Sequence, residues 1–172
     1  MSESGVAASA GSGDVPTFAS PSDFTPCVLW ALGRAVDSRA RRMVWVDPGF
    51  DAWPLDHPVL LDALSAWVRL PQRRLVLVAS DFSSVPRRHP RFTLWRRTWA
   101  HAIEAWSPSE GAELSLPTLL LDDRHLCLQV HDLARGRGGI SLDETTVRHW
   151  SEEIDVLLQR CEAAFPAHQL GL

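Results

Sequence analysis

Apolar residues recur along the chain with two different spacings, and these spacings predict both helices and strands. Spacings of three and four residues, which place apolar side chains on one face of a helix, occur at 25–38, 56–69, 92–106 and 144–161. Short apolar runs, typical of strands, occur at 43–46, 75–79, 114–121 and 125–131. The pattern therefore predicts the order helix, strand, helix, strand, helix, strand, strand, helix.

Residue types at the ends of these segments support their boundaries. Thr25 followed by Pro26 is a typical helix start, because a hydroxyl cap precedes a proline in the first turn. Ser141 and Glu144 have the spacing of a capping box and begin the last helix. An Asp-Pro-Gly sequence at 47–49 predicts a turn directly after the first strand.

Strands that alternate with helices are typical of an α/β fold. We therefore expect a mixed, mainly parallel sheet with helices on both faces. The strands at 114–121 and 125–131 form a hairpin and give this sheet an antiparallel edge. Residues 1–22 are rich in Ser, Ala and Gly, and they predict a disordered tail before a single domain at 23–172.

The composition narrows the classes of function. All 17 basic residues are arginine, and the chain has no Lys, Asn or Tyr. Without lysine it has neither a Walker-type phosphate loop nor a Schiff-base lysine. The three cysteines are an odd number and form no C-x-x-C pair, so they indicate a reduced, cytoplasmic protein without disulfides. We predict no cofactor. No apolar segment reaches the length that spans a membrane.

One predicted strand carries a row of side chains that can bind metal. Side chains alternate across a strand, so His125, Cys127, Gln129 and His131 share one face. Histidine and cysteine are zinc ligands, but neighbours on one face of a strand are widely spaced for chelation. The alternative is that this row forms the polar outer face of an edge strand.

The same segment contains a second pattern, formed by His125, position 127 and Asp132 and followed by Gly138 and Gly139. The first three positions match the H-x-K-x-x-x-x-D spacing of the phospholipase D superfamily, and the two glycines stand near the glycines that follow that motif, so the segment resembles this family. The resemblance covers residues 24–170 and implies a small bacterial phospholipase D-like domain, one half of the complete fold. The neighbouring elements that fit it are the strands at 43–47 and 74–81, the helix at 58–69 and a closing helix at 152–165.

The resemblance also implies roles for individual residues. In that family the histidine attacks phosphorus, the lysine holds the phosphate oxygens, and two motifs meet at one site. His125 would be the nucleophile or general acid, and Asp132 would orient it. Cys127 stands at the lysine position, where a neutral thiol supplies no positive charge. Arg135 and Arg137 are the candidates to hold phosphate instead.

These departures predict a domain that has lost catalysis. The chain has one motif, so a complete site requires a homodimer. We expect a catalytically degenerate phospholipase D-like domain that binds or scaffolds an unidentified protein partner in a bacterial cytoplasm. If activity remains, the domain would be a phosphodiester hydrolase.

A second hypothesis is metal-dependent phosphodiester hydrolysis. Asp47 and Asp81 follow two predicted parallel strands, whose carboxyl ends meet at one edge of a sheet. Clustered carboxylates bind Mg²⁺. Asp122 and Asp123 belong to the hairpin turn, which can point away from this edge. Aspartate is also an ordinary turn and capping residue, and this structural interpretation stays open.

A third hypothesis is nucleic-acid binding through residues 87–97. This segment contains Arg87, Arg88, Arg91, Arg96 and Arg97 and has no acidic residue. Interleaved aromatic residues can stack on bases while arginines contact phosphates. Against this, the net charge of −4 gives no general attraction to nucleic acid, and the aromatic spacing also fits the buried face of a helix. Outside this segment, Trp53 is the tryptophan we expect to be exposed and available for contacts.

Overall fold

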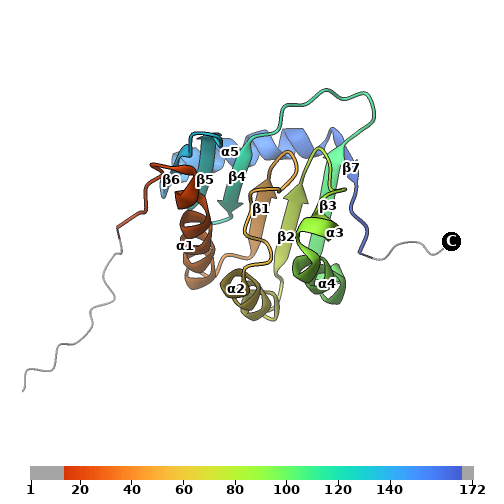
Figure 1. Cartoon of the computed structure of the whole chain (residues 1–172), viewed down its shortest axis with the longest axis horizontal. Helices are drawn as coiled ribbons and strands as arrows, with labels where there is room; N and C mark the ends of the chain where they lie inside the picture. Colours follow the sequence, from red (N-terminus) through yellow and green to blue (C-terminus); the bar gives the residue numbers. More distant parts are fainter. Residues whose placement is uncertain (1–13, 168–172) are drawn as a thin grey trace, which may run out of the picture.

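The computed structural model describes residues 14–167, and these form one seven-stranded sheet in the order β6-β5-β4-β1-β2-β3-β7 (Figure 1). The strands are β1 (Arg42–Val46), β2 (Arg74–Val78), β3 (Ile103–Pro108), β4 (Thr118–Asp122), β5 (Cys127–Asp132), β6 (Arg137–Ser141) and β7 (Cys161–Ala163). Apolar side chains cover both faces of the central strands. Met43 and Trp45 of β1 belong to one hydrophobic cluster, whereas Val44 and Val46 belong to another.

Helices cover both faces of the sheet, as the sequence predicts. The elements α1 to α4 lie on one face, and α5 packs against β4 and β5 on the other (Figure 1). The helical elements are η1 (Pro21–Asp23), α1 (Phe24–Asp37), α2 (Pro58–Val68), α3 (Val85–Arg88), α4 (Pro90–Thr98), η2 (Ala100–Ala102) and α5 (Glu144–Leu158). The mixed α/β architecture is therefore confirmed.

The prediction of a mainly parallel sheet is wrong. Only two of the pairings, β1 with β2 and β2 with β3, are parallel. The other four pairings, which join β4 to β1, β5 to β4, β6 to β5 and β7 to β3, are antiparallel. The difference arises because no crossover helix separates β4, β5 and β6, and strands joined by short turns pair antiparallel.

The helix predicted at 92–106 combines a helix and a strand. The helix α4 ends at Thr98, and β3 begins at Ile103. Ile103 and Ala105 are buried on one face while Glu104 and Trp106 are half-buried, which is the alternation of a strand. The spacing of Trp99, Ile103 and Trp106 fits a helical period as well, so the pattern alone did not separate the two elements.

The caps and the closing helix also differ from the prediction. Thr25 lies inside α1, because η1 precedes the helix and Asp23 is its N-cap. The cap of α5 is Asp143, whose side chain accepts a hydrogen bond from Thr146 N, whereas Ser141 ends β6. The last helix stops at Leu158, and the chain then forms β7.

Packed structure begins before the predicted boundary at residue 22. Phe18 packs against the core, and its ring lies 6.2 Å from that of Phe24. Asp23 accepts hydrogen bonds from the backbone N–H groups of Ala19 and Ser20. The part of the predicted tail at 1–13 lies outside the described residues. None of the helices described between residues 14 and 167 has the length and apolar character needed to cross a membrane.

Candidate functional site

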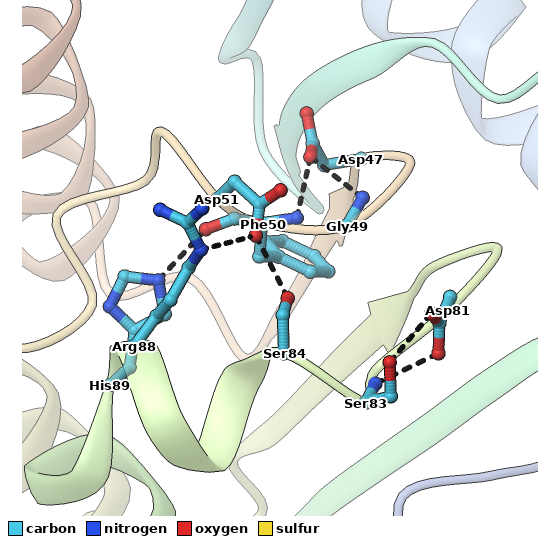
Figure 2. A network of polar contacts seen from close by, with 9 residues as sticks. All are labelled: Asp47, Gly49, Phe50, Asp51, Asp81, Ser83, Ser84, Arg88 and His89. Carbon is cyan, nitrogen blue, oxygen red and sulfur yellow. Dashed lines mark hydrogen bonds and ion pairs between the residues drawn. The ribbon is translucent and has the colours of Figure 1, made fainter.

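The carboxyl ends of β1 and β2 meet at one edge of the sheet, where Asp47 is the central buried acid (Figure 2). Its Oδ2 accepts hydrogen bonds from the backbone N–H groups of Gly49, at 3.0 Å, and Phe50, at 2.6 Å. Its Oδ1 accepts the hydroxyl hydrogen of Thr118 on β4. Both oxygens are therefore engaged by protein donors, and Asp47 stabilises the turn in which Phe50 takes a positive φ of 59°.

A second set of contacts joins this turn to the segment after β2 (Figure 2). Asp51 accepts a hydrogen bond from Ser84 Oγ at 2.8 Å and pairs with Arg88 at 3.1 Å. His89 is buried, and its Nε2 lies 2.9 Å from the carbonyl oxygen of Phe50. These contacts hold the two loops in one arrangement.

The four aspartates of the metal hypothesis do not gather at one place. Asp81 shares the edge with Asp47, but it is exposed, and hydrogen bonds from the Ser83 hydroxyl and N–H lower the pKa of its carboxyl. Asp122 pairs in register with Met43, so it lies at the opposite edge, together with Asp123. Between residues 14 and 167 there is no group of three or more His, Cys, Asp or Glu side chains placed to hold a metal ion.

The structure does not bring His125 and Asp132 together. His125 precedes β5 and Asp132 ends it, and at about 3.3 Å per residue this strand is on the order of 15 Å long. Asp132 instead pairs with Arg135 in the following turn at 3.7 Å. Arg135 and Arg137 are both exposed, on either side of Gly136.

Cys127 cannot supply the positive charge that the lysine supplies in the family motif. The residue is 2% exposed on the sheet face covered by α5, and burial raises the pKa of its thiol to about 12. The thiol therefore stays protonated and neutral near pH 7. Gln129 is half-buried and His131 exposed, so the four side chains of this row have different surroundings.

Of the two glycines that follow the motif, Gly138 is required by the packing of the strands and Gly139 is not. A Cβ at Gly138 would overlap the backbone oxygen of Gln129 and lie 2.9 Å from the Cα of Val130, its partner in the sheet. A Cβ at Gly139 would meet nothing within 4 Å. Gly138 thus permits the close approach of β6 to β5.

We expect Gly138→Ala to lower the free energy of unfolding by about 1–3 kcal/mol, because the strands must separate to admit the methyl group. Gly139→Ala is the matched control and should change it by less than about 0.5 kcal/mol. Urea denaturation followed by tryptophan fluorescence measures both. Equal losses of stability in the two variants would contradict the close approach of β6 to β5 at Gly138.

In the segment 87–97 most arginines lie at the surface, whereas the aromatic side chains pack against the protein. Arg87, Arg91 and Arg97 are exposed, whereas Arg96 is buried. The aromatic side chains turn inward: Phe92 is fully buried, and Trp95 stacks on it at 5.7 Å while its Nε1 donates to Ser65. Phe92 is therefore not available for base stacking, and Trp95 is half-buried against it.

A larger basic surface lies at the other edge of the sheet, where the parallel strands begin. Two adjoining hollows of about 640 and 440 Å³ share residues 70–73 and are lined by arginines from three connections. We call these six residues the arginine edge: Arg39, Arg41, Arg69, Arg73, Arg74 and Arg124. They come from the α1–β1 loop, the α2–β2 loop with the first residue of β2, and the β4–β5 turn.

Few acidic groups oppose this charge. Arg74 pairs with Glu104 at 3.4 Å, and Asp37 lines one of the hollows. Asp123 accepts a hydrogen bond from the backbone N–H of Arg41. Among the described residues, no carboxylate forms an ion pair with the other five guanidinium groups of the arginine edge. The six arginines of this edge therefore outnumber its acidic residues Asp37, Glu104, Asp122 and Asp123, although the chain has a net charge of −4.

No protein-family model matches the sequence, and no curated protein matches it. Among solved structures, the archaeal chromatin protein TrmBL2, described as showing a novel mode of DNA binding, has a similar fold. The TM-score is 0.57 at 13% sequence identity, and the match covers 87% of this chain and 53% of that chain. This chain thus spans about half the length of TrmBL2, and the similarity establishes the fold alone.

Sequence reasoning missed the arginine edge, although a signal for it was present. Arg39, Arg41 and Arg42 directly precede the first predicted strand, and Arg73 and Arg74 directly precede the second. Parallel strands that are neighbours begin at the same edge of a sheet, so these two groups had to converge. The contribution of Arg124 was not predictable in the same way, because it depends on β4 pairing antiparallel to β1.

Proposed function

We propose that this domain binds the backbone of nucleic acids through the arginine edge and does not catalyse a reaction there. The observation that carries the proposal is the convergence of six arginines on one edge, five of them without a carboxylate partner among the described residues. Arginine guanidinium groups form bidentate hydrogen bonds with phosphate oxygens. An excess of arginines at one edge of an acidic protein supports recognition of a polyanion at that place.

The chemistry of the surface favours contact with phosphates over reading of bases. The arginines come from loops, a turn and the first residue of β2, and none of them lies within a helix, the element that most often enters the major groove. Binding of this kind is largely independent of sequence and depends strongly on salt. The DNA-binding description of TrmBL2 supports the same class of ligand.

The relation to the phospholipase D superfamily stays a prediction of the sequence, as does the homodimer. A degenerate member of that superfamily fits a role in binding phosphodiesters, since the ligand class is kept while the chemistry is lost. The separation of His125 from Asp132 and the neutral Cys127 thiol support loss of catalysis. Hydrolysis through Asp47 and Asp81 has little support, because the Asp47 oxygens are occupied by protein donors.

The dependence of binding on salt tests the proposal directly. With a fluorescein-labelled 20-bp duplex of mixed sequence, we expect log K to fall linearly with log [KCl], with a slope of about −4 to −5 for five phosphate contacts. Fluorescence anisotropy between 50 and 200 mM KCl measures it, and a second duplex of unrelated sequence should bind equally well. Absence of binding at 50 mM KCl, or a slope near zero, would overturn the proposal.

A further inference from the structure

A small pocket between α4 and the segment after β7 contains a buried arginine that the proposed function does not use. The pocket has a volume of about 210 Å³. It is lined by Pro86, Thr93, Arg96, Arg97, Phe165 and Pro166, among others. Arg96 is 4% exposed, whereas the arginines at 87, 91 and 97 of the same segment lie at the surface. Its burial is therefore particular to this position.

The Arg96 guanidinium lacks the partners that a buried charge normally has. Its Nε and Nη1 atoms are buried and have no hydrogen-bond partner among the described residues. Its Cζ lies 4.9 Å from the centre of the Phe165 ring, which leaves a cation–π contact as its visible compensation. Burial also lowers the pKa of this guanidinium, in keeping with the cost of holding its charge away from water.

The ring above Arg96 is fixed in place. Phe165 stacks on Phe82 with a centroid distance of 5.2 Å and an angle of 7°, and its backbone has a positive φ of 45°. A positive φ is uncommon for a bulky residue and persists where the surroundings impose it. Phe165 and Arg96 thus line the pocket in fixed positions, with the aromatic ring beside the charged guanidinium group.

We propose that this pocket binds a small organic oxyanion, a carboxylate or phosphate group attached to an apolar body. The anionic oxygens would pair with Nη2 of Arg96, which, unlike Nε and Nη1, is not one of the buried atoms, while Arg97 adds a second positive charge at the mouth. The apolar body would pack against Phe165 and Pro166. The volume lies below the range of about 300–1,000 Å³ typical of drug-sized ligands, which limits the ligand to about one ring in size.

This inference is independent of nucleic-acid binding, because none of its residues belongs to the arginine edge. Each proposal therefore fails or stands without the other. Variants of Arg96 should leave binding of the duplex unchanged, and variants of Arg39 and Arg124 should leave binding of the oxyanion unchanged.

Thermal unfolding of the full chain with defined anions tests the proposal. The probes are phenyl phosphate, benzoate and inorganic phosphate, with chloride at equal ionic strength as the reference. A ligand at one hundred times its Kd raises the ratio of folded to unfolded protein about 100-fold, which appears as a higher Tm. We expect phenyl phosphate or benzoate to raise Tm more than inorganic phosphate, because only they have an apolar body.

Two substitutions and a control assign the effect to the pocket. Arg96→Met removes an unpaired buried charge and should fold with a Tm at least equal to that of the natural chain, but it should lose the response to anions. Arg97→Gln, at an exposed position, should weaken binding several-fold. Arg91→Met, also an exposed arginine of α4, is the control and should keep the full response.

Three results would overturn the proposal: no anion raises Tm beyond chloride, Arg96→Met keeps the response, or Arg91→Met loses it as well. If Arg96→Met does not fold, the comparison of Arg97→Gln with Arg91→Met decides in its place.

Discussion

Asp47→Ala is expected to lower the free energy of unfolding by about 3–5 kcal/mol. The substitution leaves the Thr118 hydroxyl and the N–H groups of Gly49 and Phe50 without their acceptor in a buried place. Each unsatisfied buried donor costs about 1–3 kcal/mol. In addition, the turn loses the contacts that hold Phe50 at positive φ.

Two further variants separate this structural role from a role in metal binding. Asp47→Asn keeps one acceptor oxygen for the two N–H groups, and its amide can donate to the Thr118 oxygen, so the loss should fall to about 1 kcal/mol. Asp81→Ala, at an exposed carboxylate, should change stability by less than about 0.5 kcal/mol. Urea denaturation measures all three. An Asn variant as unstable as the Ala variant would show that the charge, and not the turn, is what the fold requires.

The elements that could be predicted from the sequence are those with one dominant pattern. The strands β1 and β2 are continuous apolar runs because both of their faces are covered, and their buried positions follow from this alone. The β4–β5 hairpin was correctly predicted because a polar turn interrupts two apolar runs. The convergence of Asp47 and Asp81 at one edge follows from the same two parallel strands.

The elements that were missed depend on partners distant in sequence. The strand β6 contains two glycines and β7 has three residues, so neither shows a strand pattern by itself. Each is a strand because it pairs with an existing edge, β5 or β3. Trp53, expected at the surface, is 2% exposed because the loop after β1 folds back, so that its ring stacks with Trp45 at 5.4 Å. The spacing of apolar residues along the chain cannot predict that a loop folds back onto the core.

Six arginines gather at the edge where the parallel strands begin, and composition alone conceals this. Acidic residues 47, 51 and 81 lie at the carboxyl ends of the parallel strands, and the arginine edge lies at their beginnings. The net charge of −4 averages over both edges. The use of arginine for all 17 basic residues says nothing about where the arginines gather. Topology decides this, because parallel neighbours bring the residues before each strand to one place.

Charge reversal at the arginine edge is expected to weaken duplex binding about 100-fold. Arg39→Glu together with Arg124→Glu removes two exposed guanidinium groups from one hollow and places negative charges there. Hydrogen bonds to charged groups contribute about 1.5–3 kcal/mol each, and 1.4 kcal/mol corresponds to a factor of ten in Kd. The slope of log K against log [KCl] should become shallower by about 2, because two phosphate contacts are lost.

The matched control reverses two exposed arginines of the segment 87–97 instead. Arg87→Glu together with Arg91→Glu makes the same change of net charge, so any effect of overall charge is equal in the two variants. We expect this control to bind within about threefold of the natural chain at 150 mM KCl, where charges more than about 8 Å apart are screened. Anisotropy titrations with the labelled duplex compare the variants after thermal unfolding has shown that both are folded. A greater loss in the control would assign binding to the segment 87–97 and remove it from the arginine edge, whereas equal losses would show that net charge alone determines affinity.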